Sequence, residues 1–72
     1  MALIKNIKIE GEFITLGQFL KVADIISSGG EAKSFFVTNR VLINNEEDNR
    51  RGRKLYKDDI VEIDRKQYRI CI

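Results

Sequence analysis

The chain of 72 residues is 43% hydrophobic, holds one cysteine and no histidine, and carries a formal net charge of +2. A chain of this length has room for one small core, so we expect one domain, residues 1–72, without space for a large substrate pocket. The single Cys71 excludes an internal disulfide, and without histidine the usual general base and zinc ligand are missing. We therefore predict a protein that is not an enzyme and that binds no metal, cofactor or small-molecule substrate. Because no apolar run approaches the roughly 18 residues of a membrane span, we expect a cytoplasmic protein without a membrane partner.

Charge is distributed unevenly along the chain. Through Asp48 there are five basic and seven acidic residues, and from Asn49 onward there are eight basic and four acidic ones. The densest basic cluster has no acid within it and consists of Arg50, Arg51, Arg53, Lys54 and Lys57. Such a cluster repels itself unless a polyanion or solvent relieves the repulsion, so it points to nucleic acid, with a merely solvated loop as the alternative. The acidic residues 46–48 before it lack the spacing of a calcium loop and are interpreted as a solvated turn.

The first expected elements are a strand and a helix. Residues 3–9 alternate loosely between apolar and polar side chains, which predicts a half-buried edge strand that ends at Gly11. Thr15, followed three residues later by Gln18, forms a capping box, so a helix is expected from Leu16 to a break at residues 27–30. The expected buried stripe of this helix has helical spacing and consists of Leu16, Phe19, Leu20, Ala23 and Ile26.

A second helix is expected between the glycine-bearing turn at residues 27–30 and Arg40. At about 3.6 residues per turn, one stripe consists of Ala32, Phe35, Phe36 and Asn39, and another of Lys33, Val37 and Arg40. One face can therefore pack while the other meets an anionic partner, although a core helix with a solvated basic edge fits the same pattern. The backbone N–H groups at Gly29 and Gly30 are candidate donors to a phosphate.

The remaining pattern is that of strands and turns. Residues 41–43 predict a strand, Asn44 and Asn45 a turn with left-handed backbone, and residues 46–53 an exposed loop. Residues 60–63 and 68–72 alternate and predict a hairpin. The sum is an α+β fold in which a two-helix hairpin packs on a small, mostly antiparallel sheet.

Four blocks, in their order and spacing, resemble the alpha-L RNA-binding motif: Thr15–Lys21, Ser28–Lys33, Val41–Asn45 and Asp59–Ile63. This is the domain named after ribosomal protein S-four, and the resemblance covers about residues 14–63. Residues 49–56 are more narrowly similar to the stand-alone, YaaA-like bacterial members of this family. The resemblance implies that the two helices and the adjoining loop form an RNA-contacting face. It also places Lys33 where a basic residue contacts phosphate, and Asn44 where the family has the asparagine of a turn.

We therefore predict a monomeric, non-catalytic RNA-binding protein that recognises structured RNA by shape and phosphate charge, with ribosomal RNA as the class that the resemblance favours. Lys21, Lys33 and Arg40 would follow one phosphate strand, and the arginine-rich turn would lie on the same side of the molecule. The candidate RNA-binding residues are Lys21, Gly29, Gly30, Lys33, Arg40, Asn44, Arg50, Arg51, Arg53 and Lys54.

Two alternative functions remain open from the residues. One is a protein adaptor whose basic loop docks on an acidic partner, for example on a ribosome. The other is a DNA-binding helix-turn-helix, which is disfavoured because Glu31 and Ala32 stand where base-reading side chains would be needed.

Overall fold

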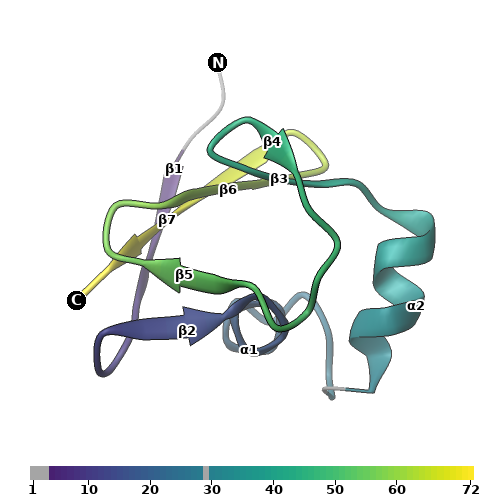
Figure 1. The fold of residues 1–72 in the computed structure, drawn as a ribbon, viewed down its shortest axis with the longest axis horizontal. Helices are drawn as coiled ribbons and strands as arrows, with labels where there is room; N and C mark the ends of the chain where they lie inside the picture. Colours follow the sequence, from purple (N-terminus) through teal and green to yellow (C-terminus); the bar gives the residue numbers. More distant parts are fainter. Residues whose placement is uncertain (1–3, 29) are drawn as a thin grey trace.

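A computed structural model gives the arrangement of the chain (Figure 1) and describes residues 4–28 and 30–72. In chain order the elements are β1 (Ile4–Lys8), β2 (Phe13–Thr15), α1 (Leu16–Val22), α2 (Glu31–Thr38), β3 (Val41–Ile43), β4 (Glu46–Glu47), β5 (Lys54–Tyr56), β6 (Ile60–Ile63) and β7 (Lys66–Cys71). Five strands form a sheet in the order β1-β7-β6-β3-β4, and β2 pairs with β5 in a separate two-stranded sheet. Only the pairing of β1 with β7 is parallel among the described strands. The predicted α+β fold with a mostly antiparallel sheet is confirmed.

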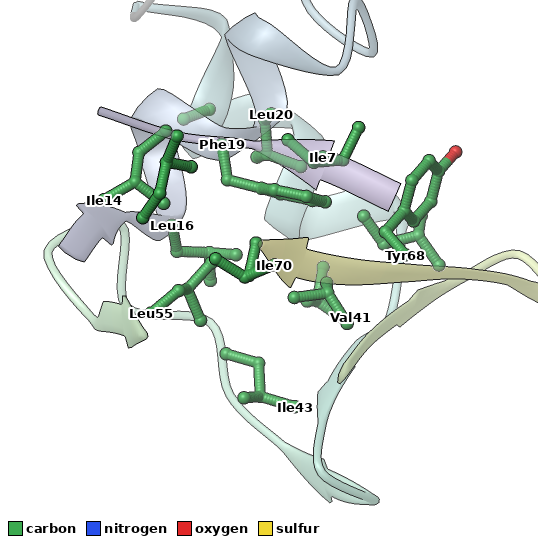
Figure 2. Packing of buried hydrophobic residues seen from close by; sticks show 14 of the residues in the cluster. Ile7, Ile14, Leu16, Phe19, Leu20, Val41, Ile43, Leu55, Tyr68 and Ile70 are labelled. Carbon is green, nitrogen blue, oxygen red and sulfur yellow. The ribbon is translucent and has the colours of Figure 1, made fainter. Parts of the chain in front are cut away.

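The core lies between α1, the inner face of the large sheet and the small sheet (Figure 2). The alternation predicted for the β6–β7 hairpin is present, because Val61, Tyr68 and Ile70 are all buried. Phe19 of α1 meets Tyr68 edge to face with ring centroids 5.5 Å apart, an arrangement that aromatic pairs favour. This packing joins the first helix to the last strand and so fixes the scaffold on which the exposed loops are carried.

The capping box that opens α1 is confirmed. The backbone N–H of Gln18 donates to Thr15 Oγ1 at 3.3 Å, and Gln18 Oε1 accepts from the Thr15 N–H at 3.1 Å. The predicted length of the helix is wrong, however, because α1 ends at Val22, where Asp24 adopts a left-handed backbone with φ of 63°. Ile26 is still buried, because the chain folds back after the helix. The N–H groups of Ile25 and Ile26 both donate to the Leu20 carbonyl. The connection to α2 therefore spans residues 23–30 instead of the predicted four-residue turn.

Helix α2 lies at one side of the molecule (Figure 1) and has the two faces that its sequence predicts. Ala32 is fully buried, and Phe35 and Phe36 are partly buried against the core. On the opposite face Val37 is 81% exposed. The helix ends at Thr38 instead of Arg40, because the backbone is already extended at the next residue.

The turns are formed by residues that tolerate left-handed backbone. Asn44 and Asn45 have φ values of 52° and 70° and join β3 to β4, as predicted, and Asp64 and Arg65 do the same between β6 and β7. The exposed loop was predicted to begin at residue 46, and this boundary is wrong. Residues Glu46–Glu47 pair with β3 as the short edge strand β4. The edge position predicted for β1 is confirmed.

Candidate nucleic-acid interface

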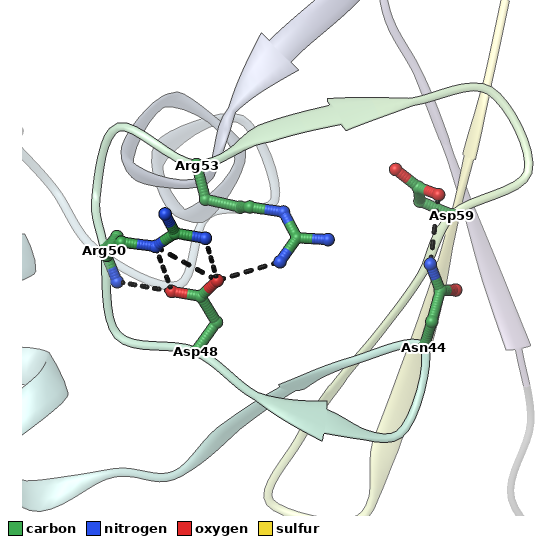
Figure 3. A network of polar contacts seen from close by, with 5 residues as sticks. All are labelled: Asn44, Asp48, Arg50, Arg53 and Asp59. Atoms are coloured by element: carbon green, nitrogen blue, oxygen red, sulfur yellow. Dashed lines mark hydrogen bonds and ion pairs between the residues drawn. The ribbon is translucent and has the colours of Figure 1, made fainter.

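Residues 48–53, here called the arginine loop, are organised by the carboxylate of Asp48 (Figure 3). It accepts hydrogen bonds from the Arg50 N–H at 2.9 Å, from Arg50 Nη2 at 2.8 Å and from Arg53 Nη1 at 2.8 Å. The Asp48 side chain is only 9% exposed. The interpretation of Asp48 as part of a solvated acidic turn is therefore wrong. The arginine cluster has no acid within its own sequence, but in the structure two of its arginines pair with Asp48, which precedes it.

The ionisation of Asp48 is stabilised by these contacts. Hydrogen bonds from the Arg50 side chain hold the pKa of Asp48 well below its ordinary value, although partial burial acts in the opposite direction. The same pairing raises the pKa of Arg50. Both partners thus remain charged through the neutral range, so the ion pair between them persists there.

Backbone hydrogen bonds attach the arginine loop to the first turn of α1. The N–H groups of Leu16 and Gly17 donate to the carbonyls of Arg53 and Arg51 at 2.7 and 2.9 Å. A Cβ at position 17 would lie 3.2 Å from Arg51 Cγ and 3.3 Å from the Arg51 carbonyl oxygen, so glycine permits this close approach. The start of α1 consequently holds the loop in place, and these two N–H groups already have partners.

The arginine loop and α2 enclose a groove of about 500 Å³. Its lining consists of Lys33, Phe36, Val37, Asn49 and Arg51. Within the described part of the chain neither Lys33 nor Arg51 takes part in an ion pair, whereas Arg50 and Arg53 both do. The groove therefore brings together two of the predicted residues, from a helix and a distant loop, with their charges uncompensated.

A model described as the S4 domain matches residues 7–71 of this sequence. The chain belongs to the S4 domain family. A protein of Bacillus subtilis (strain 168) named "Probable ribosome maturation protein RlbA" is 64% identical over 58 residues, which cover 81% of this chain and 82% of that protein. No solved structure matches the chain.

Three other predicted cations of this S4 domain, Lys21, Arg40 and Lys54, lie outside the groove. Lys21 borders a hollow of about 790 Å³ next to Lys8, and Arg40 borders another of about 310 Å³ next to Arg65. Arg40 also pairs with the exposed carboxylate of Glu47 at 3.3 Å. The structure thus does not gather Lys21, Lys33 and Arg40 in one hollow. Lys54 lies on the small sheet, with its ammonium 4.8 Å from the centroid of the Phe13 ring.

Asn44 has a structural role in this S4 domain (Figure 3). Its side-chain amide donates to Asp59 Oδ1 at 3.1 Å and accepts from the Ile60 N–H at 3.0 Å. Asp59 Oδ2 in turn accepts from the Tyr56 N–H at 2.7 Å. These bonds connect the β3–β4 turn to β6 and to the end of β5, which accounts for asparagine at this position without an RNA contact.

The start of α2 offers less to an anion than the sequence suggested. Gly29 lies outside the described residues, and Gly30 is the N-cap with no side-chain cap. The N–H of Glu31 already donates to the Ser28 carbonyl at 3.1 Å, and the Glu31 carboxylate in the first turn would repel a phosphate. Residues 4–28 and 30–72 contain no cluster of three acidic or cysteine side chains that could hold a metal ion, and no helix among them is long and apolar enough to cross a membrane.

The sequence did not reveal that Asp48 organises the arginine loop. It also did not identify Asn49, Phe36 and Val37 as residues that line the groove. One local signal for Asp48 was present, because an aspartate often accepts the backbone N–H two residues further on, as it does here from Arg50. Arg53 reaches the same carboxylate only because the chain turns at residues 51–52, so this second contact required the structure.

Proposed function

We propose that this S4 domain is a non-catalytic RNA-binding protein that binds structured ribosomal RNA during ribosome maturation, through the groove between α2 and the arginine loop. Support for the ribosome as the setting comes from the name of the Bacillus subtilis relative. In that setting we expect the protein to be cytoplasmic. We propose that it binds as a monomer.

The proposal rests on a division of roles among the arginines of the arginine loop. Asp48 pairs with and orients Arg50 and Arg53, while Arg51 is left to line the groove opposite Lys33. A guanidinium and an ammonium on facing walls suit two phosphates of a folded RNA, because phosphate contacts fix register and orientation without reading sequence. Recognition would then depend on the shape of the RNA more than on its bases.

The arrangement of the helices argues against a DNA-binding helix-turn-helix. That motif joins its helices by a turn of about 3–4 residues, which sets the angle of the recognition helix. Here residues 23–30 separate α1 from α2, and Glu31 stands in the first turn of the second helix.

The proposal is tested with the double variant Lys33→Glu/Arg51→Glu, titrated against purified bacterial ribosomal subunits and against protein-free ribosomal RNA. Because two cations that meet phosphates are reversed, affinity should fall by about tenfold or more, and the slope of log affinity against log salt should decrease by about two. The matched control is Lys5→Glu/Lys66→Glu, which makes the same change in net charge at exposed positions of β1 and β7.

Equal losses of affinity in the two double variants would mean that binding follows net charge alone. This result would contradict the assignment of the groove as the RNA-binding site. Unchanged affinity in the Lys33→Glu/Arg51→Glu variant would overturn it as well. Retention on subunits with no binding to protein-free RNA would favour the protein adaptor instead.

A further inference from the structure

The two-stranded sheet of β2 and β5 presents aromatic side chains to solvent outside the groove. Phe13 lies directly opposite Tyr56 in the antiparallel register. Because side chains alternate across a strand, Phe13, Tyr56 and Lys54 share the outer face, whereas Ile14 and Leu55 face the core. Phe13 is 41% and Tyr56 48% exposed. We call the outer residues Phe13, Lys54 and Tyr56 the aromatic platform.

The geometry of the platform leaves aromatic surface uncovered. The ring centroids of Phe13 and Tyr56 are 6.0 Å apart and their planes are inclined by 49°, so the two rings do not cover each other face to face. The Lys54 ammonium lies 4.8 Å from the centroid of the Phe13 ring. A positive charge is thereby held over one face of the Phe13 ring.

The hollow that borders the platform holds two lysines among apolar side chains, which include the exposed Val22. Phe13 lines it together with Lys8 and Lys21, against which Glu10 supplies one carboxylate. Such a mixture of exposed rings and lysines does not resemble the core of a protein–protein interface, from which lysine is depleted. It does match the chemistry of single-stranded nucleic acid, which offers flat bases and anionic phosphates together.

We propose that the platform binds an unpaired nucleotide of the same RNA, an inference that depends on the function proposed above. The base stacks on the aromatic rings, and Lys54, Lys8 and Lys21 lie near the adjoining phosphates. The path from the groove is direct, since β5 begins immediately after the arginine loop and runs away from α2 (Figure 1). An RNA strand that leaves Arg51 can follow β5 to Tyr56. This assigns a role to Lys21, which lies outside the groove.

Tyrosine fluorescence gives a direct test, because the chain has two tyrosines and no tryptophan. Tyr68 is buried against Phe19, so a Tyr68→Phe variant keeps the edge-to-face packing and leaves Tyr56 as the sole fluorophore. Titration with an oligoriboadenylate of about eight nucleotides should quench this emission. An abasic strand of the same length should leave it unchanged, because it carries the phosphates without the bases. Equal quenching by both strands would overturn the platform.

Binding of the labelled oligonucleotide is then measured by anisotropy for single variants of the platform. Phe13→Leu and Tyr56→Leu should each weaken binding by about tenfold, which is the loss of one stacked base. Their salt slope should stay that of the wild type, because no charge is removed. Tyr56→Phe, which keeps the ring, should bind as the wild type does. Full binding by the leucine variants would show that the aromatic rings take no part in binding RNA and would overturn the proposal.

The outcome is separable from that of the groove experiment. An unquenched Tyr56 overturns the platform even where Lys33→Glu/Arg51→Glu loses its affinity for ribosomal RNA as expected. Quenching that is specific to bases supports the platform even where the groove variant retains full affinity for ribosomal RNA.

Discussion

The two walls of the groove are held in different ways. The arginine loop is fixed by polar contacts: the Asp48 carboxylate inside the loop, and the backbone bonds from Leu16 and Gly17 of α1. Helix α2 is attached through apolar contacts of Ala32, Phe35 and Phe36, and within the described residues its hydrogen bonds stay inside residues 28–39. Charge and hydrogen bonding therefore place Arg51, whereas packing places Lys33.

This difference shows why counting arginines overestimates the cationic surface. Arg50 and Arg53 stand on either side of Arg51, yet they pair with Asp48 within the chain, and Arg51 alone of these three lines the groove. The paired arginines act as structural residues that set the position of the third. The loop wall should accordingly respond to changes at Asp48 that leave the helix wall untouched.

The largest expected effect is that of Asp48→Ala, which removes the acceptor of several charged hydrogen bonds. The half-buried Arg53 is then left without its ion-pair partner. We expect the free energy of unfolding to fall by about 2–3 kcal/mol, as measured by urea denaturation. Most of this loss should come from Arg53, whose side chain is 30% exposed, because Arg50 is 71% exposed and well solvated.

The matched control for this variant is Glu47→Ala, one residue earlier. Glu47 also pairs with an arginine, Arg40, but both side chains are exposed, so its removal should change the free energy of unfolding by less than about 0.5 kcal/mol. Equal effects at the two positions would contradict a specific anchoring role for Asp48.

Lowering the pH should reduce the free energy of unfolding gradually, and by less than Asp48→Ala does. Since the pKa of Asp48 is lowered in the folded state, its contribution is complete above the unfolded pKa, near 3.8, and is lost as the pH falls below that value. By pH 3 the wild type should lose about 1 kcal/mol through this carboxyl group. Asp48→Asn should lack this component, so the difference in unfolding free energy between the two proteins should shrink between about pH 4 and pH 2. A constant difference over this range would show that Asp48 does not titrate as the structure implies.

Much of the scaffold follows from local patterns in the sequence. The capping box at Thr15, the left-handed turn at Asn44 and the alternation of β6 and β7 each depend on residues close together in the chain, and each is present. The early end of α1 was missed because its apolar stripe continues to Ile26. A left-handed backbone at Asp24 preserves the burial of Ile26 without the helix.

The parts that escaped prediction depend on contacts distant in sequence. The pairing of Phe13–Thr15 with Lys54–Tyr56 joins two three-residue strands from opposite halves of the chain, each too short to show a clear period. The groove has the same origin, since Lys33 and Arg51 line one hollow only because the loop is bonded to α1. The cationic composition of this region was readable from the sequence, but the division into paired and unpaired arginines was not.

The smallest expected effect on stability, and the sharpest comparison of the two walls, is that of Gly17→Ala. Alanine should favour α1 by up to about 1 kcal/mol, while a Cβ only 3.2 Å from Arg51 Cγ and 3.3 Å from its carbonyl oxygen pushes the loop away and weakens a hydrogen bond of similar value. The two terms nearly cancel, so the free energy of unfolding should change little while the affinity for ribosomal subunits falls several-fold, because Arg51 is displaced from Lys33. Gly52→Ala is the control, since a Cβ there meets no atom within 4 Å and should leave both quantities as they are. If Gly17→Ala binds ribosomal subunits as tightly as the wild type, the placement of Arg51 by α1 has no part in binding. The position of the loop wall would then matter no more for affinity than that of the helix wall.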